Sequence, residues 1–278
     1  MTEIAETAPA NQGLGDFVPA TEELLYERRG STAILTFNHP SARNAMTWAM
    51  YEGLYDVCEH VDADERVRVL VMRGAGDQAF VAGTDIAQFR AFATAEDVLS
   101  YEHTVARNIG RIESIQKPTL AMIRGYCVGG GALIAASCDL RIASPDARFG
   151  VPIARTLGNM VSSYGLARLV ALIGPSRTKE ILFTSRFIEA TEGAAIGLFN
   201  EIVPSEGLED RTMELATLMA GQAPLTLRAV KEAVRRILDH ATPPDEADDL
   251  ILSCYMSADF KEGVAAFLEK RRPQWTGR

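Results

Sequence analysis

Two stretches decide the fold of this chain, Ala79-Phe80-Val81-Ala82-Gly83-Thr84-Asp85-Ile86 and Gly125-Tyr126-Cys127-Val128-Gly129-Gly130-Gly131. Each follows an apolar run that is typical of a strand and precedes a segment that is typical of a helix. Backbone N–H groups at such a strand-to-helix turn have no partner within the helix and can face an anion. Taken alone, the first stretch is more often an ordinary turn, and the second is more often a site of tight helix–strand packing.

Working outward from these loops, strand and helix patterns alternate over the first two-thirds of the chain, and the last third is helical. The predicted strands span residues 24–28, 32–37, 66–73, 119–128 and 139–143. The predicted helices span residues 47–61, 94–115, 132–137, 162–172, 175–184, 191–197, 208–221, 224–238, 245–256 and 258–271. We therefore predict an α/β fold in three parts: a disordered N-terminal tail (1–20), a core (21–205) and a helical C-terminal region (206–278).

The overall composition argues against several classes of protein. The chain has 278 residues, is 47% hydrophobic and carries a formal net charge of -9, so it can bury a full core and is a poor candidate for binding nucleic acid. Its four cysteines are scattered, which argues against a disulfide framework and a metal site and favours a reducing, cytoplasmic location. The most apolar stretch, residues 119–140, is interrupted by Arg124 and by glycines, so we predict no membrane span.

The order A-F-x-A-G-x-D followed by G-Y-x-x-G-G-G resembles the enoyl-CoA hydratase/isomerase (crotonase) family. The resemblance runs from about Leu24 to Trp275 and includes Asn38-His39-Pro40, Arg43-Asn44-Ala45-Met46 and Ala147-Arg148-Phe149-Gly150. It implies a crotonase-like spiral of ββα turns with a helical C-terminal trimerisation region, and hence a homotrimer or a dimer of trimers. It also implies an acyl-CoA substrate, with coenzyme A as part of that substrate and no separate cofactor.

The resemblance also implies where the substrate binds. The family's two backbone donors, which form the oxyanion hole for a thioester enolate, fall by position on the N–H groups of Ala82 and Gly130. The implied substrate-binding positions are Arg43, Ala45, Asp85, Ile86, Gly129, Phe267 and Lys270, with Phe267 and Lys270 coming from a neighbouring subunit. We expect Asp85 to brace its own loop through backbone N–H groups.

The chain departs from the family at both catalytic glutamates of the hydratases. One glutamate is expected two residues after the last glycine of the second loop, where this chain has Leu133, and the other after Pro152, where it has Ile153. Dehalogenase-like members carry an aspartate near the position of Met160. Positioned general acids and bases usually contribute ~10²–10⁴-fold, so we do not expect efficient hydration by the glutamate pair.

Three other residues are candidates for the missing acid or base, namely Glu102, His103 and Arg155. A lone glutamate or histidine on a helix more often lies on a solvated face, and an arginine more often forms a structural ion pair. The sequence therefore predicts an acyl-CoA enzyme that stabilises a thioester enolate, nominally an enoyl-CoA hydratase or isomerase. It leaves open another acyl-CoA reaction, such as decarboxylation, hydrolysis or carbon–carbon cleavage, and also a non-catalytic acyl-CoA binder.

Overall fold

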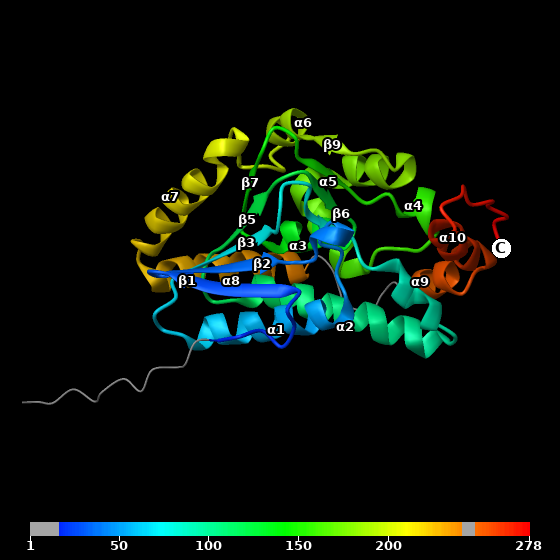
Figure 1. Ribbon diagram of the computed structural model, residues 1–278, viewed down its shortest axis with the longest axis horizontal. Helices are drawn as coiled ribbons and strands as arrows, with labels where there is room; N and C mark the ends of the chain where they lie inside the picture. The colour runs from blue at the N-terminus through cyan, green and yellow to red at the C-terminus, as the bar shows by residue number, and fades with distance from the viewer. Residues whose placement is uncertain (1–16, 241–247) are drawn as a thin grey trace, which may run out of the picture.

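Two β-sheets form the core of the protein, which the computed structural model describes over residues 17–240 and 248–278 (Figure 1). The six-stranded sheet has the order β1 (Leu24–Arg29), β2 (Thr32–Phe37), β3 (Val69–Gly74), β5 (Thr119–Ile123), β7 (Leu140–Ala143) and β10 (Glu201–Ile202). The four-stranded sheet has the order β4 (Ala79–Ala82), β6 (Tyr126–Val128), β8 (Arg148–Gly150) and β9 (Ile188–Glu189). The pairs β1–β2 and β8–β9 are antiparallel, and the other pairs are parallel.

The chain follows a repeated path between the two sheets. After β3 it enters β4 in the other sheet, and α2 (Ala95–Ser114) leads back to β5. β5, β6 and α3 (Gly130–Ser137) repeat this path, and β7 and β8 begin the next turn. This succession confirms the predicted spiral of ββα turns within an α/β fold.

The predicted strand over residues 119–128 is wrong, because the chain divides it into β5 and β6, which belong to different sheets. Arg124 and Gly125 separate the two strands, and Gly125 has a φ of 61°. A Cβ atom at Gly125 would lie 2.1 Å from the carbonyl oxygen of Gln78, so no side chain fits there. The apolar pattern continues across the break because β5 and the middle of β6 are both buried, so periodicity alone could not reveal it.

The first two long helices begin where their capping residues predict. Thr47 precedes α1 (Trp48–Ala63), and its hydroxyl oxygen accepts the N–H of Met50 at 3.2 Å. At the start of α2, Thr94 and Asp97 form the capping box, in which each side chain accepts the N–H of the other residue. α1 and α2 pack against each other along the lower edge of the molecule in Figure 1.

The C-terminal third is helical, as predicted, and consists mainly of α5 (Ser163–Thr184), α6 (Ala190–Ala195), α7 (Leu208–Ala220), α8 (Pro224–His240), α9 (Asp248–Tyr255) and α10 (Ala258–Leu268). The break predicted between the helices 162–172 and 175–184 is confirmed, because the backbone of α5 is non-helical at Gly174, with a φ of 78° and a ψ of 161°. Residues 245–247 of the predicted helix 245–256 lie outside the described residues. α9 packs on α2, and α10 packs on the short 3₁₀ helix η2 (Ile86–Ala91), so these helices reach the loops of the core (Figure 1). The predicted boundary at 206 falls within another short 3₁₀ helix, η3 (Ser205–Gly207).

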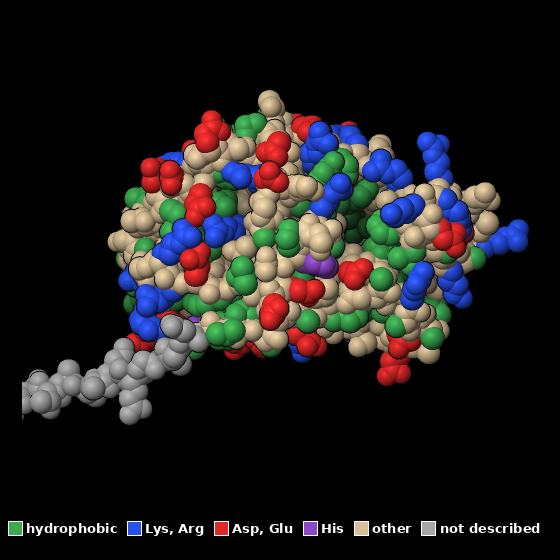
Figure 2. All heavy atoms as spheres, in the orientation of Figure 1, with side chains coloured by type: hydrophobic (Ala, Val, Ile, Leu, Met, Phe, Trp, Pro, Cys, Tyr) green, Lys and Arg blue, Asp and Glu red, His purple; other side chains and the backbone are tan. Residues whose placement is uncertain are grey.

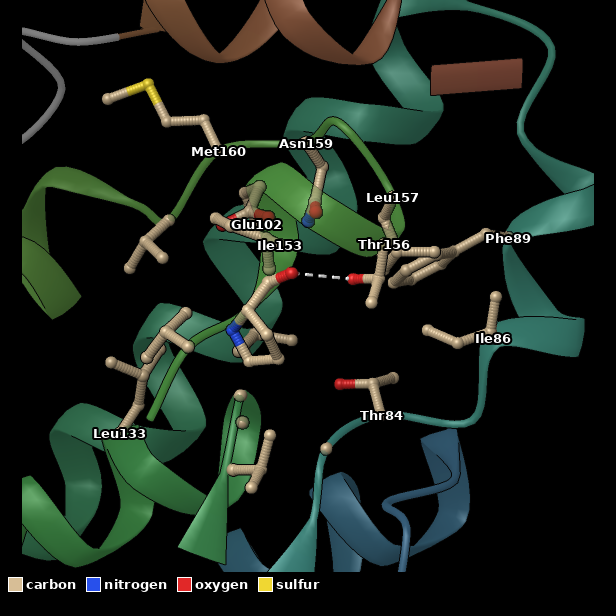
Figure 3. A pocket seen from close by; sticks show the side chains of 18 of the residues that line it. Thr84, Ile86, Phe89, Glu102, Leu133, Ile153, Thr156, Leu157, Asn159 and Met160 are labelled. Atoms are coloured by element: carbon tan, nitrogen blue, oxygen red, sulfur yellow. Dashed lines mark hydrogen bonds between the residues drawn. The ribbon is translucent and has the colours of Figure 1, made fainter. Parts of the chain in front are cut away.

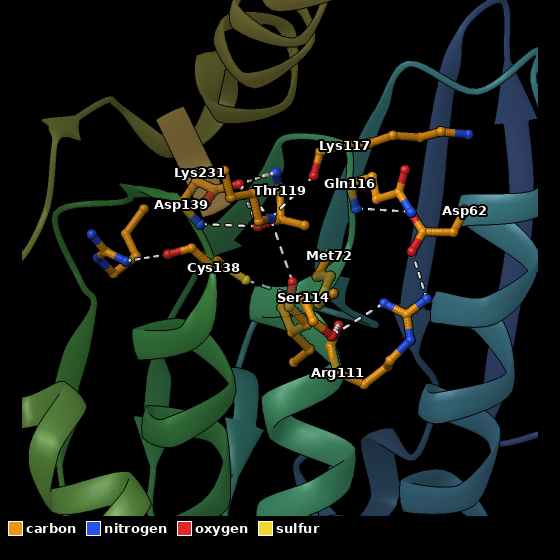
Figure 4. A network of polar contacts seen from close by, with 12 residues as sticks. Asp62, Met72, Arg111, Ser114, Gln116, Lys117, Thr119, Cys138, Asp139 and Lys231 are labelled. Carbon is orange, nitrogen blue, oxygen red and sulfur yellow. Dashed lines mark hydrogen bonds and ion pairs between the residues drawn. The ribbon is translucent and has the colours of Figure 1, made fainter. Parts of the chain in front are cut away.

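A largely buried lysine ties α8 to the core. Lys231 Nζ donates to Asp139 Oδ2 at 2.8 Å and to the carbonyl oxygen of Lys117 at 3.1 Å (Figure 4). The same carboxylate oxygen accepts the N–H of Thr119 at 2.7 Å. One aspartate therefore holds the start of β5 and a helix of the C-terminal region together.

The N-terminal segment is described from residue 17 onward, so residues 1–16 of the predicted tail lie outside the described residues. Phe17 stacks on the ring of His60, with 4.4 Å between the ring centroids, and meets Tyr26 edge-on at 5.4 Å. The prediction of disorder over 1–20 is therefore wrong at Phe17, because this side chain packs against α1 and β1.

Candidate active site

A mostly apolar cavity of about 190 Å³ lies where the two glycine loops meet α2, α4 (Ile153–Thr156) and the C-terminal helices (Figure 3). Figure 2 shows a hollow between the body of the molecule and its C-terminal end, with Lys and Arg side chains gathered around it. Apolar walls and basic residues nearby suit a ligand that has an apolar part and an anionic part.

Each glycine loop offers one backbone N–H group to the cavity. Met46 donates its N–H to the Gly83 carbonyl oxygen at 2.8 Å, and Asp85 donates its N–H to the Met46 carbonyl oxygen at 2.9 Å. In such a parallel bridge the residue between the two contacts, Thr84, turns its own N–H to the opposite side, and Thr84 lines the cavity. Gly130 also lines the cavity and is the first residue of α3, where N–H groups lack partners within the helix. The two loops lie next to each other, since a Cβ at Gly130 would lie 3.3 Å from Thr84 Oγ1, so both residues belong to the same part of the cavity wall.

The structure corrects the predicted donor in the first loop. The N–H of Ala82 donates to the carbonyl oxygen of Arg43 at 3.1 Å, so the prediction of Ala82 as an oxyanion donor is wrong. Gly83 follows with a φ of 108°, and this turn interrupts the alternation of N–H directions along β4. The donor that the first loop offers is therefore Thr84.

Aliphatic side chains stand where the resemblance implies two glutamates. Leu133 on α3 and Ile153 at the start of α4 both line the cavity (Figure 3). Met160 lines it as well and supplies no carboxylate. Because these positions face the cavity, the cavity itself lacks the two carboxylates that the resemblance implies.

Glu102 brings a carboxyl group into this cavity from α2. The residue is 6% exposed, and it is the only Asp or Glu among the described residues that line the cavity. Burial raises the pKa of Glu102 to about 7, and the hydrogen bond from the hydroxyl of Tyr255 acts in the opposite direction. At neutral pH both protonation states are populated, which suits a group that transfers protons.

A short chain of hydrogen bonds holds Glu102 in place. Tyr255, at the end of α9, donates its hydroxyl to Glu102 Oε1, and Asn159 Nδ2 donates to the hydroxyl oxygen of Tyr255 at 3.0 Å. On the other side of the cavity, 2.8 Å separate the hydroxyl oxygen of Tyr51 from Thr84 Oγ1. Sequence reasoning missed the roles of Tyr51, Asn159 and Tyr255, because they come from distant parts of the chain and no motif surrounds them.

The other two acid or base candidates lie outside the cavity. His103 follows Glu102 on α2, but its side chain is 53% exposed and its Nε2 lies 3.5 Å from Asp248 Oδ2. Arg155 is exposed on α4 and is not among the lining residues. The structure therefore separates Glu102 from both residues and contradicts His103 and Arg155 as groups that act in this cavity.

Three of the predicted substrate-binding residues line the cavity, namely Ile86, Gly129 and Phe267. Gly129 has a φ of 57°, and its N–H donates to the carbonyl oxygen of Gly150 at 2.9 Å. Phe267 lies on α10 and lines the cavity of its own chain, while its contact with a CoA bound to a neighbouring subunit stays a prediction. These residues form part of the wall around the two backbone donors.

Four of the predicted substrate-binding residues do not line the cavity, namely Arg43, Ala45, Asp85 and Lys270. Asp85 instead caps η2, as we expected, by accepting a backbone N–H at 3.0 Å. Ala45 does not offer its backbone N–H to a ligand, because this group donates to the Ala42 carbonyl oxygen at 3.1 Å. Arg43 is exposed, with its guanidinium carbon 5.4 Å from the ring centroid of Tyr126, and Lys270 is exposed beyond the end of α10. Contacts of Arg43 and Lys270 with the CoA nucleotide stay predictions.

Thiol and metal chemistry find little support in the described part of the chain. Cys58, Cys127 and Cys138 are buried, and burial raises the pKa of each thiol, which disfavours the thiolate. Residues 17–240 and 248–278 contain no group of three or more His, Cys, Asp or Glu side chains that could hold a metal ion. Over the same residues, no helix is long and apolar enough to cross a membrane.

Comparisons with known proteins find similar sequences and similar folds. The sequence model of a family described as "Enoyl-CoA hydratase/isomerase" matches residues 27–278. The chain is 33% identical to the short-chain-enoyl-CoA hydratase of Clostridium acetobutylicum, over 90% of this chain and 95% of that protein. It is 35% identical to the crotonyl-CoA hydratase of Syntrophomonas wolfei subsp. wolfei, over 91% of this chain and 97% of that protein.

Two solved structures extend the comparison to the fold. One is a methylmalonyl-CoA decarboxylase in complex with 2-nitronate-propionyl-CoA, with a TM-score of 0.84 and 29% identity over 93% of this chain and 100% of the other. The second is an enoyl-CoA hydratase/carnithine racemase from Magnetospirillum magneticum, with a TM-score of 0.76 and 33% identity over 94% of this chain and 97% of the other. Both similarities cover nearly the whole chain.

Proposed function

This chain belongs to the enoyl-CoA hydratase/isomerase family of CoA-thioester enzymes, and we propose that its reaction is the shift of a carbon–carbon double bond in an acyl-CoA. One observation carries the proposal: Glu102 is the only carboxyl group among the described lining residues, and its pKa is about 7. A double-bond shift needs one group that removes a proton and returns it elsewhere, so a single carboxyl is sufficient.

In the proposed reaction the thioester oxygen accepts hydrogen bonds from the N–H groups of Thr84 and Gly130. The Glu102 carboxylate removes a proton from C2 of a 3-enoyl thioester, and the electron pair of the C–H bond forms a dienolate whose charge rests on that oxygen. The carboxylic acid then gives the proton to C4, which leaves the double bond between C2 and C3. The reaction consumes no water or electrons, so the CoA carried by the substrate is the only coenzyme it requires. Each backbone donor is typically worth ~3 kcal/mol of the barrier.

Hydration by a pair of glutamates is not supported, although two of the relatives described above are hydratases. That mechanism holds a water between two carboxylates, whereas Leu133 and Ile153 present aliphatic groups to the cavity. Loss of a positioned general acid or base usually lowers a rate by ~10²–10⁴-fold. We therefore expect hydration of crotonyl-CoA to be slow in comparison with isomerisation of a 3-enoyl-CoA.

Decarboxylation is the second candidate, and the structural comparison favours it. The TM-score with the methylmalonyl-CoA decarboxylase is 0.84, against 0.76 with the hydratase/racemase. In that reaction the bond between C2 and a carboxylate breaks, CO₂ leaves, and neutral Glu102 protonates C2 of the enolate. A charged Glu102 would repel the substrate carboxylate, so decarboxylation should slow as pH rises through 7, whereas isomerisation should accelerate.

We propose a homotrimer or a dimer of trimers as the assembly. α8 exposes Val230, Val234 and Ile237, which share one face at the spacing i, i+4, i+7, and such an exposed apolar row is typical of a surface that another chain covers. The four scattered cysteines, all free thiols, support a cytoplasmic location.

The test of the function is incubation of the full-length protein with 3-butenoyl-CoA, crotonyl-CoA and methylmalonyl-CoA, each followed by product mass and by absorbance of the conjugated thioester. Isomerisation forms the conjugated thioester with no change in mass. Hydration adds one water, and decarboxylation removes carbon dioxide. Turnover of crotonyl-CoA to the hydrate at a rate that exceeds isomerisation would reject the proposal.

A matched pair of variants connects the activity to Glu102. Glu102→Gln keeps the shape of the side chain and an oxygen that can accept from Tyr255, and we expect kcat to fall by ~10²–10⁴-fold while the thioester still binds. Glu52→Gln changes an exposed carboxylate of α1 outside the cavity and should keep the wild-type rate. Full activity in Glu102→Gln would exclude Glu102 as the base. Tight binding of every thioester without turnover would identify a non-catalytic acyl-CoA binder.

A further inference from the structure

The side chain of Asn159 has one hydrogen-bonding group that is occupied and one that is not. Its Nδ2 donates to the hydroxyl oxygen of Tyr255 at 3.0 Å, and Tyr255 donates to Glu102 Oε1. An ionised Glu102 can only accept, so the proton of Tyr255 is committed to it, and the oxygen of Tyr255 must accept from Asn159. The Asn159 amide is therefore oriented with Nδ2 toward Tyr255 and Oδ1 away from it.

Asn159 Oδ1 is buried and has no hydrogen-bond partner among the described residues. Asn159 lines the cavity, and Figure 3 shows its amide pointing into the cavity from the side opposite Thr84. Buried acceptors in folded proteins are nearly always satisfied, because an unpaired one loses its hydration without compensation. A single unsatisfied acceptor on the wall of a binding cavity indicates a ligand that brings a donor.

The surrounding wall restricts the chemistry of that donor. The hydroxyl of Thr156 already donates to the Pro152 carbonyl oxygen at 2.9 Å (Figure 3), and the neighbouring Phe89 and Leu157 are apolar. Glu102 is the only charged side chain among the described lining residues, and in the proposed reaction its carboxylate must take up a proton and then release it. A cationic ligand group next to it would hold it ionised, so a neutral donor fits this wall better.

We propose that Asn159 Oδ1 accepts a hydrogen bond from a hydroxyl group on the acyl chain, which makes hydroxylated acyl-CoA thioesters the substrate class of this site. The proposal rests on the proposed function, because it takes the thioester end of the ligand to lie at Thr84 and Gly130. An acyl chain that is held there crosses the cavity toward Asn159. A site that hydrogen-bonds a substrate hydroxyl rejects an analogue without it, because the protein acceptor then stays unpaired.

The test measures equilibrium binding of saturated acyl-CoA thioesters, which cannot undergo a double-bond shift, so it does not depend on turnover. Each ω-hydroxyacyl-CoA, from the butanoyl to the octanoyl series, is compared with the thioester in which a methyl group replaces the hydroxyl. We expect the hydroxylated ligand of the best length to bind at least ~10-fold more tightly to the wild-type protein. Equal binding of the two members of every pair would overturn the proposal.

Two variants assign the preference to one atom. Asn159→Leu should weaken binding of the hydroxylated ligand to the level of its methyl analogue, while binding of the methyl analogue shows that the cavity is intact. Thr156→Val is the matched control, because it removes a hydroxyl of the same wall whose proton is already committed, and the preference should persist. A preference that survives in Asn159→Leu would also overturn the proposal. If Asn159→Leu removes the preference but the wild-type protein does not isomerise 3-enoyl-CoA, the hydroxyl site is retained and only the proposed reaction is rejected.

Discussion

The two walls of the cavity are built in different ways. In the reaction proposed above, the thioester meets a wall formed by the backbone N–H groups of Thr84 and Gly130, whose directions follow from the path of the chain through two glycine loops. The opposite wall consists of the side chains of Glu102, Asn159 and Tyr255, which come from α2, the segment after α4, and α9. The first, which we call the backbone wall, depends on turn geometry. The second, which we call the side-chain wall, depends on which residue occupies each position.

This difference explains how the chain can keep the two backbone donors of the proposed oxyanion site although Leu133 and Ile153 replace the expected glutamates. Leu133 lies on the same helix as Gly130, yet an aliphatic residue there leaves the N–H of Gly130 in place, because that donor belongs to the backbone. The acid or base of such a cavity can therefore change without rebuilding the donors. Each prediction below perturbs one wall and measures whether the other responds.

The largest effect is expected at the backbone wall. A Cβ at Gly130 would collide with the hydroxyl oxygen of Tyr51, so Gly130→Ala must displace Tyr51 or the first turn of α3. We expect kcat for 3-enoyl-CoA isomerisation to fall by ~10²–10³-fold, which is typical of the loss of one oxyanion donor. A wild-type rate in this variant would exclude the N–H of Gly130 from the reaction.

Two further variants serve as controls for that prediction. Tyr51→Phe added to Gly130→Ala removes the oxygen that collides, so it should restore part of kcat. Gly207→Ala tests the addition of a methyl group by itself, because a Cβ there would meet Val203 Cγ1 at an ordinary distance of 3.7 Å. This variant should keep both the rate and the stability of the wild-type protein.

The second prediction tests the burial of the side-chain wall. The pKa of Glu102 is raised from 4.5 to about 7 in the folded protein, so the folded state holds this proton more tightly than the unfolded state. The stability that Glu102 contributes is therefore complete below pH 4.5 and is lost as pH rises through 7. One pKa unit corresponds to ~1.4 kcal/mol, so the loss should be about 3 kcal/mol. Glu102→Gln does not ionise and should lack this loss.

Urea unfolding of the wild-type protein and of Glu102→Gln, from about pH 4 to about pH 9, measures this effect. The other titrating groups are shared by the two proteins and cancel in the difference between their free energies of unfolding. The variant should gain stability relative to the wild-type protein as pH rises. A difference that does not change with pH would mean that Glu102 has an ordinary carboxyl pKa, and would remove the main reason to assign it the proton transfer.

The contrast between the walls also accounts for what the sequence could predict. The local patterns of strand, glycine turn and helix predict the α/β class and the places of the two glycine loops, whereas the spiral of ββα turns and the donor at Gly130 are implied by the resemblance to the crotonase family. The first donor was misplaced by two residues, at Ala82 and not Thr84, because the turn at Gly83 changes which N–H faces the cavity. Such a change depends on one φ angle, which the residue type permits but does not determine.

The side-chain wall could be predicted only in part. Glu102 and His103 are neighbours on α2, about 100° apart around the helix, and sequence alone does not say which of them faces the cavity. Tyr255 meets Glu102 across 153 residues, and Asn159 meets Tyr255 across 96 residues. The contact between Tyr255 and Glu102 results from the packing of α9 on α2, and neither contact leaves a periodic pattern in the chain.

The smallest effect distinguishes support of Glu102 from proton transfer itself. The hydrogen bond from Tyr255 lowers the pKa of Glu102 against the effect of burial, so Tyr255→Phe should raise that pKa above 7. Burial raises the pKa of Tyr255 well above its ordinary value, so this hydroxyl stays protonated and its loss does not remove a titrating group. Because isomerisation starts from the carboxylate, kcat at pH 7 should fall by up to ~10-fold per unit of pKa change and should recover once the pH exceeds the new pKa. A pH profile of kcat for both proteins measures this shift. A loss of equal size at every pH would instead mean that Tyr255 acts on the reacting atoms, and the side-chain wall would then contain a catalytic pair in place of one supported carboxyl.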